Sequence, residues 1–236
     1  MVLDGEFSFA SQAPDFDRHI TASIRGYDGL RDDCVALSQY FIQPKTKVLD
    51  IGCSEGTLLR RVREHNLNRF KSVKYVGIDV EDNFRQHWES DKSSNLIFKK
   101  KDITKYTDFD NTSLVISLYT FQFLPETERL PLMKRIFDGL VDGGAILIAE
   151  KVHAKNAKFQ DMLAFTYYDY KRQSFTEKEI LDKERSIRNQ MKPWSEWKLF
   201  EMIRAAGFVS TNTQLFWRNH LFVGILAYKP AKFRGG

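Results

Sequence analysis

The residues best placed to do chemistry lie in one short segment in the first quarter of the chain. Asp50 follows an apolar run, and two glycines come after it in the turn Asp50-Ile-Gly-Cys-Ser-Glu-Gly56. Glycine lets the backbone turn tightly and lets its amides approach a ligand with no Cβ in the way. Ligands of open α/β sheets bind beyond the carboxyl ends of the strands. The turn therefore indicates a binding site, with Asp50, Gly52, Cys53, Ser54 and Gly56 as its candidate residues.

Two further acids follow later apolar runs. Asp79, with Val80 after it, closes the second run, and Asp102, with Ile103 after it, follows the third. An acid after the second strand accepts hydrogen bonds from ribose hydroxyls in nucleotide-binding folds. A single Asp of this kind is more often a helix N-cap or a solvated strand end. Three acids and a glycine turn, each after the expected strand, favour a nucleoside site instead.

The turn also distinguishes between two cofactors. A dinucleotide fingerprint has three glycines that receive a pyrophosphate at a helix N-terminus. This turn has two glycines, and Asp50 stands before them. A carboxylate there would repel a pyrophosphate, but it suits the ammonium group of a methionine moiety. The residues favour S-adenosylmethionine (SAM) over a dinucleotide.

Other kinds of chemistry have weaker support. Cys53 has no second cysteine at C-x-x-C spacing, so we interpret it as a small packed residue. The five histidines show no metal-ligand spacing, and we predict no catalytic metal. Two cysteines and no long apolar run predict a cytoplasmic protein without a membrane partner. The net charge of +5 permits a nucleic-acid acceptor without requiring one.

The elements that must position these residues alternate between strands and helices. We expect strands at 47–51, 74–79, 96–103, 113–119 and 144–150, helices at 57–65, 126–140 and 197–206, and final strands at 215–217 and 221–228. Such alternation predicts a mostly parallel sheet covered on both faces. We therefore predict an α/β, Rossmann-like class I methyltransferase fold with a C-terminal antiparallel hairpin. Residues 1–236 form one domain, with an N-terminal helical layer at 14–43 and a helical insert at 155–195.

On these motifs the chain resembles the carboxy-S-adenosylmethionine synthases, a branch of the class I family. The similarity runs over residues 14–229, and its motifs are Ile24-Arg-Gly-Tyr27, Phe41-Ile-Gln-Pro44, Asp50-Ile-Gly-Cys-Ser54, Phe121-Gln-Phe-Leu-Pro125, Gly143-Gly-Ala-Ile-Leu, Ala149-Glu-Lys151, Asp169-Tyr-Lys-Arg172, Glu179-Ile180, Ala206-Gly-Phe208 and Phe216-Trp217. The glycine turn is general to SAM enzymes, whereas the Gly-Tyr pair, the Gln-Phe-Leu segment and the Asp-x-Lys-Arg helix are more specific.

The resemblance implies a fold, an activity and a set of site residues. Enzymes of that family use SAM and prephenate to make the carboxylated cofactor for a tRNA wobble-uridine modification. By this resemblance Tyr27 closes over the cofactor, the turn lines its methionine part, and Asp79 and Asp102-Ile103 hold its ribose and adenine. The cofactor implied is SAM or carboxy-S-adenosylmethionine.

The chain differs from that family at two positions. Leu118 stands where the family has an Asn near the end of the fourth strand. Glu184 stands where the family has an Arg that grips the cofactor's carboxylate, and Arg185 is displaced by one residue. One residue on a helix is about 100° of rotation. Which of the two residues faces the cofactor therefore decides how a carboxylate is recognised.

Three functions are compatible with these residues. The first is methyl transfer from SAM to a small-molecule or nucleic-acid acceptor. The second is carboxy-SAM synthesis from SAM and prephenate, and the third is a non-catalytic SAM-binding partner subunit. Methyl transfer needs mainly an aligned acceptor, helped by a base. The candidate bases are Tyr168, Tyr167, Glu150 and Tyr119, the candidate anion-binding residues are Lys151 and Arg172, and Arg185 is the candidate carboxylate anchor.

The insert at 155–195 has a further predicted role. Its aromatic segment, residues 165–175, carries several large side chains in a charged surrounding. Exposed aromatic patches are often interfaces. We therefore predict a homodimer formed through this insert.

Overall fold

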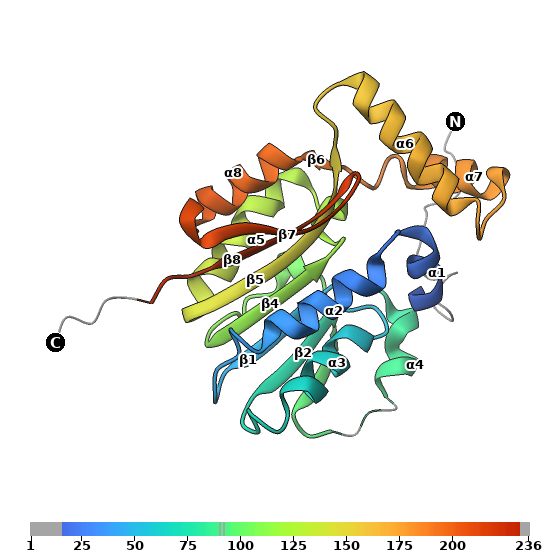
Figure 1. Ribbon diagram of the computed structural model, residues 1–236. Coiled ribbons are helices and arrows are strands. Elements are labelled where there is room, and N and C mark those ends of the chain that lie inside the picture. The colour runs from blue at the N-terminus through green and yellow to red at the C-terminus, as the bar shows by residue number, and fades with distance from the viewer. Residues whose placement is uncertain (1–15, 90, 92, 232–236) are drawn as a thin grey trace.

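A twisted sheet forms the centre of the molecule in the computed structural model, which describes residues 16–231 except 90 and 92 (Figure 1). Within that part of the chain the strand order is β3-β2-β1-β4-β5-β8-β7, with β6 paired to β5 alone. The strands are β1 (Lys47–Ile51), β2 (Lys74–Asp79), β3 (Leu96–Lys100), β4 (Thr112–Leu118), β5 (Leu140–His153), β6 (Trp194–Ser195), β7 (Thr213–Asn219) and β8 (Phe222–Tyr228). Strands β1 to β5 pair in parallel, and β8 is antiparallel to both β5 and β7. This confirms the predicted sheet and its C-terminal hairpin.

Two pairs of helices cover the faces of the sheet. Helices α2 (Tyr27–Ser38) and α3 (Thr57–Asn66) pack on one face, with Leu30, Cys34 and Leu59 in their shared core. Helices α5 (Glu126–Gly139) and α8 (Glu196–Ala206) pack on the other, where Ile136 and Ile203 are buried. Because both faces are covered, the inner strands are buried along most of their length, and their sequences are apolar runs without alternation.

Three helices lie at the carboxyl edge of the parallel strands (Figure 1). They are α1 (Phe16–Ser23), α6 (Ala157–Lys171) and α7 (Glu177–Ile187). The two helices of the insert have side-chain N-caps, since the Asn156 carboxamide accepts from the Phe159 amide and Thr176 with Glu179 forms a capping box. The insert returns to the sheet through β6, whose Trp194 and Ser195 pair with Val152 and His153 of β5.

The observed elements differ from the predicted ones mainly in length. Strand β5 begins at Leu140, where the helix was expected to end, and runs to His153 because it pairs with β4, with β8 and, at its last two residues, with β6. Strand β4 ends at Leu118, since Tyr119 has a positive φ of 60° that breaks the extended backbone. Two short elements were not predicted, the 3-10 turn η2 (Asp82–Phe84) and the helix α4 (Arg85–Trp88).

The remaining short elements are single turns of 3-10 helix. They are η3 (Ile103–Lys105), η4 (Phe121–Phe123) and η5 (Ser210–Asn212). The first two follow the carboxyl ends of β3 and β4, so they contribute to the rim of the sheet. In the part of the chain that the structure describes, no helix combines the length and apolarity needed to cross a bilayer.

Candidate functional site

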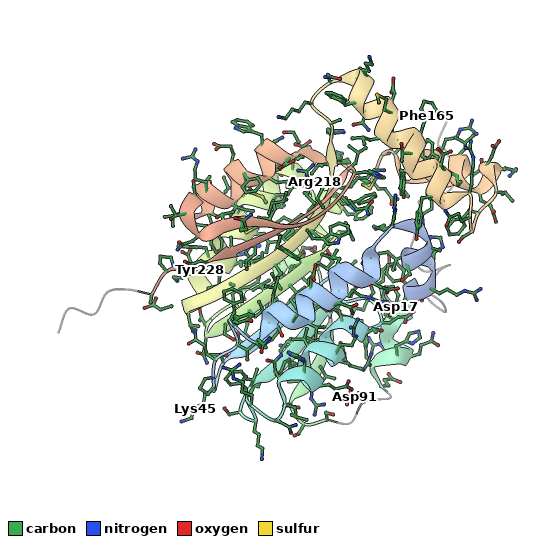
Figure 2. All side chains as sticks on the ribbon, in the orientation of Figure 1. Asp17, Lys45, Asp91, Phe165, Arg218 and Tyr228 are labelled. Atoms are coloured by element: carbon green, nitrogen blue, oxygen red, sulfur yellow. The ribbon has the colours of Figure 1, made fainter. Side chains whose placement is uncertain are left out.

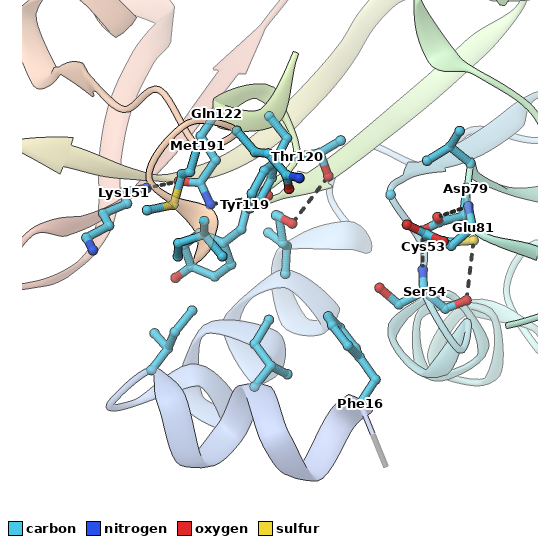
Figure 3. Close-up of a pocket in the computed structure, with 18 of the residues that line it drawn as sticks. Phe16, Cys53, Ser54, Asp79, Glu81, Tyr119, Thr120, Gln122, Lys151 and Met191 are labelled. Carbon is cyan, nitrogen blue, oxygen red and sulfur yellow. Dashed lines mark hydrogen bonds between the residues drawn. The ribbon is translucent and has the colours of Figure 1, made fainter. Parts of the chain in front are cut away.

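A cavity of about 750 Å³ opens at the carboxyl ends of the parallel strands, bounded on its outer side by α1, α6 and α7. Figure 3 shows that labelled residues from different elements reach into it from opposite ends, with Asp79, Ser54 and Cys53 at one end and Lys151, Tyr119 and Met191 at the other. The position is the one that open α/β sheets use for ligands.

The glycine turn forms the floor of one end. Gly52 has a positive φ of 74°, and a Cβ added there would lie 2.1 Å from the Thr120 Oγ1 atom. Its amide donates to the Ile78 carbonyl oxygen at 2.8 Å, which ties the turn to β2. Ser54 also has a left-handed backbone, with φ of 48°. The positive φ and the close approach to Thr120 both favour glycine at position 52.

We call this end of the cavity the acidic end and define it by three of its carboxyl groups: Asp50, Asp79 and Asp102. The amides of Ser54 and Glu81 each donate to the Asp79 carboxylate at 2.9 Å, one to each oxygen. Burial raises the pKa of Asp79 in spite of these bonds. Burial, together with the charges of Asp79 and Asp17, raises the pKa of Asp50 to about 7. A pKa of about 7 leaves the Asp50 carboxyl group about half ionised at neutral pH, so a cationic ligand would favour its charged form.

Asp102 has a structural role as well as a place in the cavity. Its Oδ1 atom accepts from the Thr104 amide at 2.9 Å and from the Thr104 hydroxyl at 2.8 Å, so it is the N-cap of η3. These hydrogen bonds lower the pKa of Asp102. Its ion pair with Lys105 is loose, at 3.7 Å. One oxygen is therefore committed to the cap, and the other remains available at the cavity wall.

The structure brings together ten of the eleven residues that the sequence predicted for the cofactor. Those that line the cavity are Tyr27, Asp50, Gly52, Cys53, Ser54, Asp79, Val80, Asp102, Ile103 and Leu118. Gly56 does not line it. It is the N-cap of α3 with φ of 83°, and a Cβ there would lie 2.4 Å from the Phe98 ring. The second glycine of the motif thus serves the packing of the turn against β3.

The opposite end of the cavity carries ammonium groups. Lys151 of β5, Lys171 of α6 and Lys183 of α7 all line it, and we call these three the basic end. Glu184 lies among them, with its carboxylate 3.8 Å from the Lys151 Nζ atom. Burial lowers the pKa of Lys151 and of Lys171, while Glu184 opposes both shifts. Burial also lowers the pKa of Lys183, to about 8.

His19 of α1 stands beside this basic end. Its Nε2 atom is in contact with the Lys183 ammonium group. Burial and the charges of Lys183 and Lys171 lower the pKa of His19 to about 4. The imidazole is therefore neutral at physiological pH, so it can accept a hydrogen bond from a neighbouring ammonium group and does not repel it.

Aromatic rings connect the two ends of the cavity. The Tyr27 and Tyr119 rings lie 6.1 Å apart, Tyr119 and Phe222 5.7 Å, and Phe222 and Tyr167 5.3 Å. The Lys151 ammonium lies 5.1 Å from the centre of the Tyr167 ring. Ring faces attract cations. The middle of the cavity is therefore apolar but tolerant of positive charge.

The three residues predicted to be catalytic lie outside the cavity. Arg172 is exposed and pairs with Asp169 and Glu177. Arg185 is also exposed and lies 3.6 Å from Asp182.

Tyr168, the third of them, packs against Tyr167 and Phe165 without lining the cavity. In each case the preceding residue lines the cavity instead, namely Tyr167, Lys171 and Glu184. On a helix, one residue is about 100° of rotation.

Glu150 is not a base within the cavity. It is fully buried, and the amides of Phe121 and Gln122 donate to its two carboxylate oxygens at 2.9 Å each. Burial nevertheless raises the pKa of Glu150 to about 8. Its place is behind the cavity wall, where it fastens η4 to β5.

Several lining residues were not singled out by sequence reasoning. Lys171 and Lys183 were missed, as were Gln122 and Met191. The signal for Lys171 was present, since it stands four residues after Tyr167 and so shares its helix face. No three His, Cys, Asp or Glu side chains within residues 16–231 lie close enough together to hold a metal ion.

Comparisons with known proteins agree with this geometry. Residues 48–144 match the family model described as a methyltransferase domain. A carboxy-S-adenosyl-L-methionine synthase from Staphylococcus epidermidis is 30% identical over 228 residues, which cover 95% of this chain and 97% of that protein.

Solved structures share the fold at lower identity. The cyclopropane synthase MmaA2 from Mycobacterium tuberculosis matches with a TM-score of 0.56 and 18% identity, over 78% of this chain and 62% of that one. Human N-acetylserotonin methyltransferase, solved in complex with SAM, matches with a TM-score of 0.51 and 16% identity, over 78% of this chain and 48% of that one.

Proposed function

The chain belongs to the carboxy-S-adenosyl-L-methionine synthase family, and from this membership we propose that it transfers a carboxyl group from an anionic donor to SAM. It is a SAM-dependent transferase with a class I methyltransferase fold. One observation carries the proposal. A single cavity has Asp50, Asp79 and Asp102 toward one end and the ammonium groups of Lys151, Lys171 and Lys183 toward the other, so it fits a cationic cofactor beside an anionic second substrate.

The acidic end fits SAM by the chemistry of its groups. Asp50 is a buried carboxylate without a neighbouring cation, which the ammonium group of a methionine moiety would neutralise. Asp79 is held by two amides and is placed to accept from ribose hydroxyls. Ile103 offers an apolar surface to the adenine ring, and Asp102 retains one oxygen for its amino group. When bound, SAM supplies an activated carbon on a positively charged sulfur.

The basic end fits a carboxylate donor. Lys151, Lys171 and Lys183 outnumber Glu184, so the protonated cluster keeps a net positive charge. All three ammonium groups are largely removed from water, and an anion brought among them is stabilised more strongly than at an exposed surface. Tyr167 separates Lys151 from Lys171, because its ring lies within 5.2 Å of both ammonium groups. The three residues bind and orient the donor.

Prephenate is the donor that the family resemblance implies. In the proposed reaction the methyl carbon of SAM exchanges a proton for the donor's carboxyl group. The donor ring loses that carboxyl and its hydroxyl as it becomes aromatic, and the hydroxyl leaves with the proton as water. Purified protein incubated with SAM and prephenate is therefore expected to yield carboxy-SAM and phenylpyruvate, identified by mass. Consumption of SAM without a carboxylated nucleoside would overturn the proposal.

Methyl transfer is the second candidate, and Glu184 is the observation that favours it. This carboxylate lies inside the cavity, whereas Arg185 points to solvent. A carboxylate where the family has a guanidinium disfavours a carboxylated cofactor. In the same assay with an anionic acceptor, methyl transfer would release S-adenosylhomocysteine and a methylated product. The two outcomes differ in the mass of the nucleoside.

We also retain the proposal of a cytoplasmic homodimer formed through the insert. Phe159, Met162 and Phe165 stand exposed at helical spacing along α6, and Figure 2 shows Phe165 on the outside of the molecule. Light scattering measures the mass of the particle in solution. A dimer that Phe165→Asp converts to a monomer supports this interface, and a monomeric native protein excludes it.

A further inference from the structure

Tyr119 combines two unusual features at the carboxyl end of β4. Its φ of 60° lies in the left-handed region, which large side chains rarely adopt. Its hydroxyl is buried and has no hydrogen-bond partner among the described residues. The side chain is only 6% exposed, yet it lines the cavity. Strained backbone and unsatisfied buried polar groups are both concentrated at ligand sites.

The surroundings of Tyr119 show which part of the cavity its hydroxyl serves. The Tyr119 amide donates to the Ala149 carbonyl oxygen at 2.7 Å, which places it beside the end of β5. Lys151 follows two residues later on β5 and pairs with Phe222 of β8. The Phe222 ring lies 5.7 Å from the Tyr119 ring and 5.9 Å from the Lys151 ammonium. Figure 3 shows Tyr119 and Lys151 at the same end of the cavity.

Both groups are able to donate to an anion. Burial raises the pKa of Tyr119 well above its ordinary value, so the phenol stays protonated and donates. Glu150, the buried acid behind it, is already held by two backbone amides. Glu184 lies 3.8 Å from the Lys151 ammonium, which is longer than a hydrogen bond, so an oxygen of the ligand competes with it for that ammonium.

We propose that the Tyr119 hydroxyl and the Lys151 ammonium together hold the carboxylate that is transferred, in place of the arginine that this chain lacks at position 184. This inference rests on the proposed function, because the same carboxylate belongs first to the donor and then to carboxy-SAM. Tyr119 is a binding residue for that group, and Lys151 supplies the charge.

The test compares two ligands that differ by one carboxylate, SAM and carboxy-SAM, by calorimetry. Tyr119→Phe removes a single oxygen and is expected to weaken carboxy-SAM binding by about tenfold, as loss of a hydrogen bond to a charged group does. SAM affinity should stay within about twofold, because the group lost bonds only the added carboxylate. Tyr75→Phe is the matched control, since the Tyr75 hydroxyl is also buried and unpartnered in the described chain but lies outside the cavity.

A double variant tests whether Tyr119 and Lys151 bind the same carboxylate. In a Lys151→Met background, Tyr119→Phe should weaken the binding of carboxy-SAM by a smaller factor than it does in the native protein, because the two residues hold one group. Equal losses for SAM and carboxy-SAM, or no loss for either, would overturn the assignment. The binding experiment needs no turnover. A protein that makes no carboxy-SAM yet loses selectivity in Tyr119→Phe refutes the proposed function and keeps the anchor.

Discussion

The acidic end and the basic end of the cavity are built by different means. The acidic carboxylates stand at or just beyond the carboxyl ends of β1, β2 and β3, which the parallel sheet brings to one edge. Two of the three basic residues come instead from α6 and α7, which lie outside the sheet. Asp79 is held by two backbone amides, whereas the lysines have Glu184 as the acid that opposes their loss of charge.

This difference separates an end whose acids stand on the sheet from an end whose cations come partly from helices outside it. A carboxylate that accepts from backbone amides keeps its place whether or not a ligand is bound. At the basic end burial lowers the pKa of all three lysines, so their charged form is disfavoured until an anion binds. We therefore expect the acidic end to set affinity for the cofactor and the basic end to set affinity for the second substrate. The following predictions test that division, beginning with the largest effect.

Removing the Asp79 carboxylate should have the largest effect. Asp79→Ala is expected to weaken SAM binding by about 30-fold or more, because hydrogen bonds to a charged group contribute about 1.5–3 kcal/mol each. Calorimetry on the purified protein measures it. Asp82→Ala is the control, since Asp82 lies only three residues away but outside the cavity. Unchanged SAM affinity in Asp79→Ala would remove the assignment of the acidic end.

Removing a charge at the basic end should affect only the second substrate. Lys151→Met is expected to raise KM for the anionic donor by about tenfold, the loss of one charged hydrogen bond, with SAM affinity unchanged. Steady-state kinetics at varied donor concentration measures KM for the donor, and calorimetry measures the affinity for SAM. Lys198→Met serves as the control, because Lys198 pairs with Glu126 on the surface of α8. A parallel fall in SAM affinity would contradict the division into two ends.

The pH dependence should differ between the two ends. Burial lowers the pKa of Lys183 to about 8, with Lys171 adding to the shift and Glu184 opposing it, while His19 beside it stays neutral. An anion binds the protonated lysine, so donor affinity is present below pH 8 and is lost as the pH rises through it. We expect a loss of about three- to tenfold between pH 7 and 9, which is the scale of one titrating contact.

Kinetics at fixed, saturating SAM isolates this effect. Lys183→Met should flatten the upper limb of the profile for donor KM, whereas SAM affinity should rise slightly over the same range, because Asp50, with a pKa of about 7, becomes fully ionised. A limb that survives in Lys183→Met would show that another group titrates.

The smallest effects should come from the outward-facing arginines. Arg172→Ala and Arg185→Ala are expected to leave KM for the donor and the affinity for SAM within about twofold, since exposed ion pairs contribute little. Lys171, the neighbour of Arg172 that lines the cavity, gives the contrast, because Lys171→Ala should raise KM for the donor. If Arg185→Ala instead abolished carboxy-SAM formation, α7 would have to turn by one residue in the working enzyme.

The acidic end could be predicted from sequence because each of its parts is local. A short apolar strand, a glycine turn and a helix follow one another within Lys47–Asn66, and the place of Asp79 follows from the order of the strands. The basic end could not be predicted in the same way. The sequence identified α6 and its Asp-x-Lys-Arg motif, but whether Lys171 or Arg172 faces inward depends on the rotation of a helix whose neighbours lie far away in the chain.

Tyr119 shows a second limit of prediction from the sequence. Sequence reasoning placed it in the fourth strand, because the run before it is apolar and a tyrosine suits a strand. Its left-handed backbone arises from η4, which turns back immediately and is fastened by Glu150 from β5. The two residues in that contact are 29 positions apart in the sequence, so no local pattern predicts it. The resemblance to a family supplied the cofactor correctly, but it could not supply an orientation that depends on packing.

The two-residue strand β6 has a consequence for how such enzymes diverge. Because Trp194 and Ser195 pair with Val152 and His153, the insert leaves and rejoins the sheet at one point. Its exit and entry are neighbours, so a change in its length or content imposes no new distance on the sheet. The whole insert can therefore be exchanged as one piece, in evolution or by design. A new specificity for the second substrate then requires no change at the acidic end of the cavity.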